Sequence, residues 1–352
     1  MKQIRVTLMG CGTIGRELLQ RTAGNAHYLY VAIGDSSGFV AKKKGFREAE
    51  LTAILQHKTG GAPISTNNDG EYVGKNPIDV ISDYNAEVLI DATAEQTHKI
   101  LYKCLDFASV VTSNKLPIAD VSYVDYRRIV TKAAKTKNIL DYGTTVGAGL
   151  RIPEVIQSLG CDGITGFSGC LSGTMNYISQ RLNEKAKLSA AVKEAMNSPR
   201  HYAEPDPRKD LSGEDFRRKL IILSRLLGKK IGREDIDVEP LIPYEYVTLS
   251  KDEFLSRLPE LDENFATRVT EAKKREHVIW YLGNANLISD EFNLGFFEVS
   301  SGDPISQNKE SDNNIQIQPH LWRRPVTLIG PGAGAPETVT GLISGISSII
   351  NN

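Results

Sequence analysis

A glycine-rich turn between a predicted strand and a predicted helix constrains the fold of this chain more than any other feature. The run GCGTIG at residues 10–15 follows an alternating apolar segment at 4–8 and precedes apolar residues at helical spacing. In such a turn Gly10 permits the bend, Gly12 lets a pyrophosphate approach the backbone, and Gly15 lets the helix pack against the strand. The helix N-terminus adds N–H groups and a favourable dipole for phosphate. The pattern predicts a dinucleotide site, with an unliganded glycine turn as the alternative.

The order of strand-like and helical patterns predicts two domains. Strand-like runs recur in the first part of the chain, at 29–33, 87–90, 109–112 and 139–142, with helical stretches between several of them. This alternation predicts an α/β fold with a Rossmann-type, doubly wound parallel sheet. Later, helical patterns at 182–198, 213–227 and 337–350, a polar loop at 306–314 and irregular strands from about 278 to 328 indicate a second, α+β region. We expect a first domain at 1–142, completed by about 329–352, and a second at 143–328.

Composition and charge argue against nucleic-acid, membrane and structural-zinc partners. A formal net charge of -1 argues against a nucleic-acid partner. No apolar run approaches the ~18 to 20 residues that span a bilayer, and residues 1–10 resemble a strand rather than a leader peptide. We therefore expect a cytoplasmic protein with no membrane partner. The cysteines are scattered without metal-ligand spacing, which disfavours structural zinc; they are Cys11, Cys104, Cys161 and Cys170.

Two features bear on which dinucleotide binds. Asp35 stands 20 residues beyond Gly15 and is placed to accept hydrogen bonds from the adenine ribose hydroxyls, which favours NAD. The lysine run at 42–44 could instead attract the 2′-phosphate of NADP, although such a run is more often a solvated surface. The sequence leaves the choice between NAD and NADP open.

The densest group of charged residues lies at 201–219, HYAEPDPRKDLSGEDFRRK. Ser212 has the position of a helix N-cap, with Asp215 in a capping-box position three residues later. Asp215 and Lys219 are four residues apart and share a helix face. This face adjoins the apolar stripe Phe216, Leu220, Leu223 and Leu227, with Arg217, Arg218 and Arg225 on the other side. The pair therefore points toward the interior or a cleft, although a surface ion pair without a role is the alternative.

A lysine close to an acid suits reduction of a carbonyl group. Hydride addition places negative charge on oxygen, and an ammonium group can stabilise that charge or donate a proton. Carboxylates facing the same cleft would hold a substrate ammonium, so these residues fit an amino acid with a reducible carbonyl. Ser113, Asn114 and Lys115 follow a strand of the first domain. Ligands bind beyond the carboxyl ends of such strands, so Lys115 could reach the nicotinamide, with an exposed loop lysine as the alternative.

These blocks together resemble the homoserine dehydrogenase family across nearly the whole chain. The matching segments are GCGTIG at 10–15, VTSNK at 111–115, TVGAGL at 145–150, FSGCLSGTMNYI at 167–178, YAEPDPRKDLSGEDFRRK at 202–219 and GPGAG at 330–334. The resemblance implies NAD(P)-dependent interconversion of L-homoserine and L-aspartate 4-semialdehyde. It also implies that the second domain binds substrate, carries catalysis and forms a homodimer.

The resemblance assigns roles to individual residues. Lys219 matches the proton donor, and Lys115 matches a lysine at the nicotinamide and reaction centre. Asp215 and Glu204 match acids that bind substrate, assisted by Asp210 and with Tyr202 in the same block. The implied cofactor contacts are Gly10, Gly12, Thr13, Ile14, Gly15, Asp35, Thr93, Ser113, Lys115 and Gly334.

A loop for a monovalent cation, Na or K, is also implied by the resemblance. Its ligands would be the backbone carbonyls of Val146, Ala148 and Leu150 in TVGAGL. The chain departs from the family pattern at Gly143, where an acid is common, and this argues against tight cation binding. A second departure is Gly345, which stands where an aspartate is common.

Other classes of protein fit the sequence less well. A semialdehyde dehydrogenase acting through a cysteine thioester would need an activated thiolate with a histidine in reach, and the cysteines show no such motif. A catalytically silent nucleotide-binding regulator would keep GCGTIG but would not need Glu204, Asp215 and Lys219. The EPDPR block argues against an amino-acid dehydrogenase acting on free aspartate.

Overall fold

The computed structural model describes residues 3–160, 163–198 and 202–351. The chain divides into two compact units, Met1–Ile152 with Gly334–Asn352 and Pro153–Ala333. These bounds differ from the expected ones at both points where the chain passes from one unit to the other. Residues 143–152 belong to the first unit because their short helices η2 (Gly143–Thr145) and η3 (Ala148–Leu150) contact α15 (Ala335–Asn351). Residues 329–331 remain in the second unit because they end strand β13 (Val326–Pro331).

The first unit is built on a sheet of seven strands in the order β4-β3-β2-β1-β5-β6-β7. Five strands run in parallel: β2 (Tyr28–Asp35), β1 (Ile4–Met9), β5 (Val88–Asp91), β6 (Ser109–Thr112) and β7 (Leu140–Asp141). Two antiparallel strands, β3 (Gly38–Ala41) and β4 (Glu71–Tyr72), extend one edge. The predicted Rossmann-type parallel sheet is confirmed, and its strands are almost continuously buried, as a sheet covered on both faces requires.

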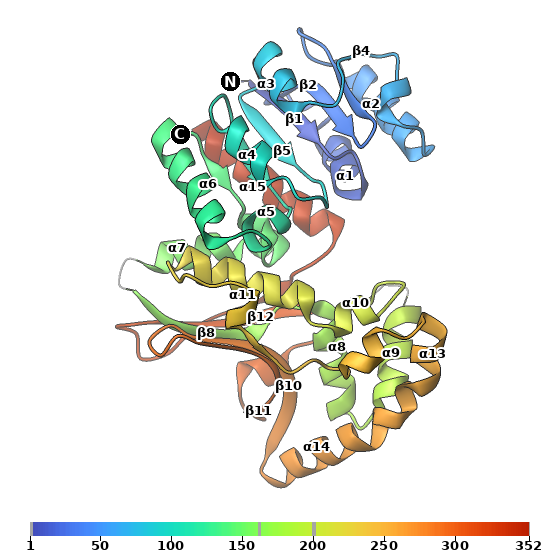
Figure 1. Cartoon of the computed structure of the whole chain (residues 1–352), viewed down its shortest axis with the longest axis vertical. Coiled ribbons are helices and arrows are strands. Elements are labelled where there is room, and N and C mark those ends of the chain that lie inside the picture. Colours follow the sequence, from blue (N-terminus) through green and yellow to red (C-terminus); the bar gives the residue numbers. More distant parts are fainter. Residues whose placement is uncertain (1–2, 161–162, 199–201, 352) are drawn as a thin grey trace. The chain divides into compact units, whose positions relative to one another are not determined.

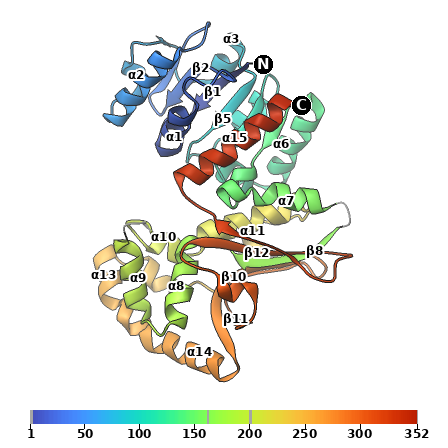
Figure 2. The same cartoon turned by 180° about the vertical axis from the view of Figure 1, so that it is seen from behind.

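Helices cover both faces of this sheet (Figure 1). One apolar core joins the sheet to α1 (Thr13–Thr22), α2 (Glu48–Thr59) and α15, with Leu18, Ile54 and Leu342 fully buried in it. The other core joins it to α3 (Pro77–Asp83), α4 (His98–Cys104) and α6 (Tyr123–Thr136). The short helix α5 (Leu116–Ala119) follows β6. Figure 2 shows α15 beside α1, which it contacts although more than 300 residues separate them.

The second unit contains a mainly antiparallel sheet in the order β13-β12-β8-β10-β11-β9. Its strands besides β13 are β8 (Ile164–Cys170), β9 (Asp237–Val238), β10 (His277–Asn286), β11 (Glu291–Ser300) and β12 (Asp312–Pro319). Helices α8 (Gly173–Asn183), α11 (Glu214–Leu226) and α14 (Asp262–Lys274) contact β10. The other α-helices among its described residues are α7 (Ile152–Leu159), α9 (Leu188–Asn197), α10 (Arg208–Leu211), α12 (Tyr244–Val247) and α13 (Lys251–Arg257). The prediction of an α+β region is confirmed. The predicted polar loop at 306–314 is wrong for residues 312–314, which belong to β12.

None of the helices in the described ranges combines the length and apolar character that crossing a membrane demands.

Candidate active site

The glycine turn has the close backbone approaches that the sequence predicted at Gly10 and Gly15. Gly10 has a φ of +102°, and a Cβ there would lie 2.7 Å from the backbone of Ala92. A Cβ on Gly15 would lie 2.1 Å from the carbonyl oxygen of Gly10, so the helix can pack this closely only on glycine. A Cβ on Gly12 would meet no described atom within 4 Å. The open side of the turn is therefore at Gly12.

The first turn of α1 supplies the polar groups that a pyrophosphate needs. Gly12 is the N-cap residue, and no side chain caps the N-terminal turn. The N–H groups of the first turn, from Thr13 to Gly15, have no carbonyl partner within a helix that starts there. The backbone N–H groups of Gly10 and Cys11 instead donate to the carbonyl of Gly34 on β2, which fixes the turn. An open glycine and an uncapped helix N-terminus fit a dinucleotide phosphate.

A buried polar network holds the loops at the carboxyl ends of β5 and β6. Asp91 accepts hydrogen bonds from the Oγ1 atoms of Thr93 at 2.6 Å and Thr97 at 2.7 Å. Asn114 donates to the carbonyl of Glu95 at 2.6 Å and to Thr93 Oγ1 at 3.2 Å. Burial raises the pKa of Asp91 above its ordinary value, against the effect of these hydrogen bonds. The network thus positions Thr93, a predicted cofactor contact.

Lys115 is positioned by the same network. Its neighbour Asn114 accepts a hydrogen bond from the backbone N–H of Leu116 at 3.0 Å. Lys115 is the N-cap residue of α5 and is partly buried, and Ser113 donates its N–H to the carbonyl of Asp91. The sequence pattern pointed to Lys115 but not to the role of Asn114, whose amide ties the two loops together.

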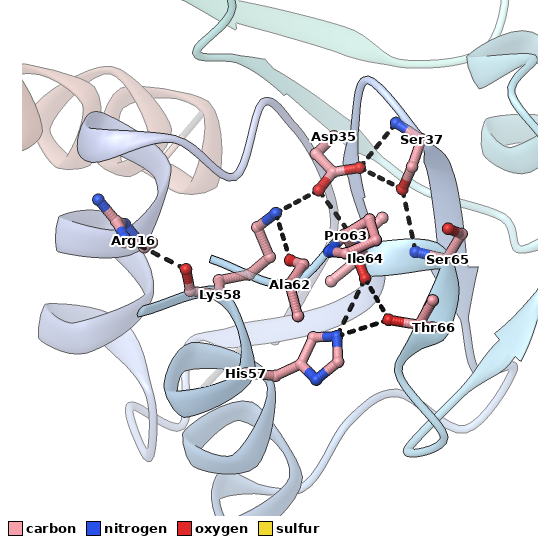
Figure 3. A network of polar contacts seen from close by, with 10 residues as sticks. All are labelled: Arg16, Asp35, Ser37, His57, Lys58, Ala62, Pro63, Ile64, Ser65 and Thr66. Atoms are coloured by element: carbon pink, nitrogen blue, oxygen red, sulfur yellow. Dashed lines mark hydrogen bonds and ion pairs between the residues drawn. The ribbon is translucent and has the colours of Figure 1, made fainter. Parts of the chain in front are cut away.

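Asp35, the expected ribose acceptor, lies in a crowded polar network at the end of β2 (Figure 3). Its Oδ1 accepts hydrogen bonds from the N–H and hydroxyl of Ser37, and its Oδ2 accepts from the N–H of Ile64 and from Lys58 Nζ. Burial raises the pKa of Asp35, but the hydrogen bonds from Lys58, Ser37 and Ile64 outweigh it and leave the pKa below its usual value. The carboxylate is therefore ionised, ion-paired and supplied with four donors.

Lys58 and Arg16 place positive charge beside the glycine turn. Both charges act on the thiol of Cys11, and Arg16 donates to the carbonyl of Lys58 at 3.3 Å. Sequence reasoning missed Lys58 because it stands 23 residues after Asp35, near the end of α2, with no local motif. Of the lysine run at 42–44, Lys42 forms an ion pair with Glu50 at 2.6 Å. Lys43 and Lys44 are exposed.

In the second unit, Lys219 is buried, unlike Lys209, the other lysine of the 201–219 block. It lies on α11 with a side chain only 8% exposed, whereas the side chain of Asp215 is 47% exposed. Lys219 Nζ donates to the carbonyl of Leu171 at 2.6 Å, just after β8, and lies 2.9 Å from Asp215 Oδ2. An ammonium group has three N–H bonds. Two are directed to these acceptors of the described chain, and the ammonium can donate to one more.

The turn before α11 differs from the expected capping box. The N-cap residue is Gly213, whose φ of +77° suits glycine, and the hydroxyl of Ser212 accepts the N–H of Glu214 at 3.4 Å. Ser212 instead ends α10 and donates its hydroxyl to the carbonyl of Lys209 at 2.7 Å. The capping-box prediction was wrong because α10 takes up the residues before Gly213. As a result Asp215 is available to Lys219 rather than to the helix end.

The other acids of the block surround the same end of α11. Asp210 accepts the backbone N–H of Glu204 at 2.8 Å. The pKa of Asp210 is raised to about 6, mainly by burial and also by the charges of Glu204 and Asp215, whereas the Glu204 N–H and the charge of Lys219 lower it. Glu204 is exposed. Glu204, Asp210 and Asp215 thus form one acidic cluster whose net charge changes near neutral pH.

Tyr202 is held next to this cluster by α8. Its ring stacks on Tyr177 with centroids 4.7 Å apart, and its carbonyl accepts the Thr174 hydroxyl at 2.5 Å. His201, which opens the block, lies outside the described residues. Sequence reasoning did not single out Thr174, although it lies in the FSGCLSGTMNYI segment.

The described cysteines do not support thioester chemistry. Cys11, Cys104 and Cys170 are buried free thiols, and burial raises their pKa values to about 11, 12 and 12. A nucleophilic cysteine needs a lowered pKa, so these three are structural. Cys161 lies outside the described residues. Across the described ranges, no group of three or more His, Cys, Asp or Glu residues is arranged to hold a metal ion.

The remaining predicted residues lie in the first unit. Gly334, with a φ of +116°, precedes α15 and accepts hydrogen bonds from the N–H and hydroxyl of Thr338. Val146 and Ala148 are buried in the TVGAGL loop, with Leu150 at the end of η3. Lys115 belongs to the first unit and Lys219 to the second.

The family model for homoserine dehydrogenase matches residues 152–346, more than half of the chain. The chain belongs to the homoserine dehydrogenase family. The matched range contains the whole acidic block with Lys219.

Curated proteins of the family align along most of the chain. A homoserine dehydrogenase of Schizosaccharomyces pombe is 29% identical over 377 residues, covering 99% of this chain and 96% of that protein. One of Emericella nidulans is 32% identical over 257 residues, covering 69% of each. A bifunctional aspartokinase/homoserine dehydrogenase of Haemophilus influenzae is 28% identical and covers 98% of this chain. The chain spans 42% of that bifunctional relative.

Solved structures share the fold. A Candida auris protein of unknown function has a TM-score of 0.88 at 26% identity, covering 100% of this chain and 99% of that one. A putative homoserine dehydrogenase of Archaeoglobus fulgidus has a TM-score of 0.78 at 22% identity, with 99% of both chains covered. A hyperthermophilic archaeal homoserine dehydrogenase in complex with NADPH has a TM-score of 0.74 at 21% identity, covering 98% and 97%.

Proposed function

We propose that this chain is an NAD(P)-dependent homoserine dehydrogenase that interconverts L-homoserine and L-aspartate 4-semialdehyde. The observation that carries the proposal is the buried ammonium of Lys219, held by Leu171 and Asp215 within the segment that matches the family. The reaction belongs to the biosynthesis of threonine, methionine and isoleucine. Purified protein is expected to reduce NAD or NADP when L-homoserine is added, in separate assays with each cofactor. No turnover with either cofactor would refute the proposal.

The residues around Lys219 can carry out the proton transfer that accompanies hydride transfer. The Gly12 turn would hold the nicotinamide cofactor, which would supply the hydride-transfer chemistry. In the direction of reduction, the carbonyl oxygen gains negative charge and takes a proton, which the ammonium of Lys219 donates. Asp215 and the carbonyl of Leu171 orient that ammonium. In the reverse direction the amine of Lys219 accepts the proton from the substrate hydroxyl. Lys115 would contact the nicotinamide from the first unit.

Recognition of the amino acid falls to the acidic cluster. Glu204 and Asp210 provide carboxylates for the substrate ammonium, and the stacked ring of Tyr202 borders them. Opposite charges that are partly withdrawn from water attract more strongly than on an open surface. An α-amino group, rather than a carboxylate alone, is therefore the recognition element that we assign to this cluster.

Substrate affinity is expected to depend on pH through Asp210. The carboxyl is anionic above its pKa of about 6 and neutral below it, so KM for L-homoserine should rise as pH falls from 7 to 5. Asp210→Asn should raise KM at pH 7 by about 10-fold, because a hydrogen bond to a charged group is worth about 1.5–3 kcal/mol. It should also flatten this part of the KM profile. Steady-state kinetics across this range measures both effects.

Asp206→Asn is the matched control. The Arg208 guanidinium holds the pKa of Asp206 below its usual value, so this carboxyl does not titrate between pH 5 and 7. In Asp206→Asn, KM should still rise as pH falls from 7 to 5. If KM of Asp210→Asn still rose over this pH range, the titrating group would be another one.

We propose that the Asp35–Lys58 pair governs cofactor choice. Asp35 alone would repel a 2′-phosphate, but Lys58 compensates its charge and Arg16 adds a second cation nearby. All four acceptor positions of the Asp35 carboxylate are also in use, so a ribose hydroxyl must displace a donor. This arrangement favours acceptance of NADP as well as NAD.

Lys58→Met is expected to lower kcat/KM for NADP by about 10-fold, because a charge-assisted hydrogen bond to phosphate is lost. The value for NAD should change less, since Asp35 is then available to the ribose. The exposed Lys44 provides the control variant Lys44→Met, which should leave both values unchanged. If Lys44→Met rather than Lys58→Met selectively reduced activity with NADP, the phosphate would lie at the lysine run.

We further propose a cytoplasmic homodimer formed through the second unit, as expected for this family. Light scattering coupled to gel filtration should give twice the chain mass of 38.7 kDa. A monomer at the concentrations used for the activity assay would refute the dimer without affecting the proposed reaction.

A further inference from the structure

A buried guanidinium occupies the TVGAGL loop of the first unit. Arg151 follows η3 and is 5% exposed. Its Nη2 lies 2.6 Å from Asp141 Oδ2, and its Nη1 donates to the carbonyl of Gly341 on α15. Asp141 is buried as well and accepts the N–H of Gly143 at 3.0 Å. The guanidinium thus joins the end of β7, the loop and the C-terminal helix.

Glycines make room for this group at two positions. A Cβ on Gly143 would lie 2.9 Å from Cζ and Nη2 of Arg151, so an acidic side chain at 143 would collide with the guanidinium. A Cβ on Gly345 would lie 2.5 Å from Asp141 Oδ2. These are the two positions at which the chain departs from the acids common in the family. The loss of both acids and the presence of Arg151 therefore belong to one local arrangement.

The loop carbonyls are also engaged within the protein. The carbonyl of Val146 accepts the N–H of Ile152 at 3.2 Å, and that of Ala148 accepts the N–H of Arg151 at 3.2 Å. Hard cations need several oxygen ligands together. Two of the three expected ligands point to backbone donors, and a positive charge already lies against the loop. The residues present do not fit a bound Na⁺ or K⁺.

We propose that Arg151 is a built-in cation that takes the place of a bound monovalent ion and makes this protein independent of Na⁺ and K⁺. Its charge compensates the buried carboxylate of Asp141, which would be costly to leave unpaired. Its planar fork of N–H groups also serves a second acceptor, the Gly341 carbonyl. Unlike an ion, the side chain cannot dissociate. Arg151 therefore secures α15 to the loop at any salt composition.

The first test compares the unmodified protein in NaCl, KCl and tetramethylammonium chloride at equal ionic strength. The large organic cation cannot enter a carbonyl loop. The same Tm in all three salts, and no binding of Tl⁺ by ²⁰⁵Tl NMR, are expected. A higher Tm in NaCl or KCl, or saturable Tl⁺ binding, would overturn the proposal. Neither readout depends on the reaction that the protein catalyses.

The second test removes the guanidinium. Arg151 has a φ of +48°, which glycine adopts easily, so Arg151→Gly leaves the backbone unstrained. Its Tm in tetramethylammonium chloride should fall by about 10 °C, because Asp141 is left buried without a cation. NaCl or KCl should restore part of that loss as an ion enters the space.

Lys137→Gly is the matched control, since Lys137 is also a cationic residue of the first unit with positive φ, at +60°, but is exposed. Its Tm should not fall and should not depend on the cation. A folded Arg151→Gly protein with one Tm in all three salts would contradict the proposal. Should Arg151→Gly fail to fold, Tl⁺ binding by the unmodified protein decides the question alone.

Discussion

Lys219→Ala is expected to lower kcat for L-homoserine oxidation by about 10²-fold or more, the usual contribution of a positioned acid–base group. Alanine leaves no group to exchange the proton with the substrate oxygen, and water must take over. Binding of NAD(P)H should be largely kept, because the glycine turn belongs to the other unit. Stopped-flow or steady-state assays give kcat, and quenching of protein fluorescence gives the cofactor Kd.

The control for this experiment lies ten residues away in the same block. Lys209 is exposed on α10, and its hydrogen bonds in the described chain are made by its backbone N–H and carbonyl. Lys209→Ala should therefore retain turnover. Near-normal kcat in Lys219→Ala would remove Lys219 from the mechanism, whereas parallel losses of kcat and Tm would indicate a structural role instead.

A pair of glycine substitutions should separate cofactor binding from folding. Gly12 has a negative φ of −85°, and its Cβ would meet no described atom within 4 Å, so Gly12→Ala should keep the Tm. The added methyl would occupy the approach of the pyrophosphate, and the Kd for NAD(P)H should rise by about 10-fold or more, a cost of about 1.4 kcal/mol or above.

Gly15→Ala should lower the Tm more than it affects the Kd for the cofactor. Its Cβ would lie 2.1 Å from the Gly10 carbonyl oxygen, so α1 must move away from the turn and the Tm should fall. Calorimetry and cofactor titration on both variants distinguish the two effects. Unchanged cofactor affinity in Gly12→Ala would mean that the phosphate does not contact this turn.

The parallel sheet and its glycine turn could be predicted because their signals are local. The apolar run of β1 and the spacing of GCGTIG specify a strand, a bend and a helix without reference to distant residues. The Asp215–Lys219 pair was predictable for the same reason, since four residues on a helix define one face. What that face meets, the carbonyl of Leu171, lies 48 residues away and could not be predicted.

Other features could not be predicted because tertiary contacts decide them. Arg225 was placed on the opposite side of its helix from the core, yet it is 2% exposed and donates to the carbonyl of Ile231. Lys58 reaches Asp35 from α2. Asn114 contacts Thr93 and Glu95, which precede it by 21 and 19 residues. Arg151 follows a loop whose sequence matches the family, and its partners become evident only when β7 and α15 are both in place.

The return of α15 to the first unit affects how this protein can be made. Val339, Leu342 and Ile346 belong to the same apolar core as Leu8 and Leu18. During synthesis the sheet that begins to form first must therefore wait, with part of its apolar surface uncovered, until residues 335–351 have left the ribosome. Nascent chains that stop before α15 should depend on chaperones, while the intervening residues 153–333 have their own sheet around which to fold.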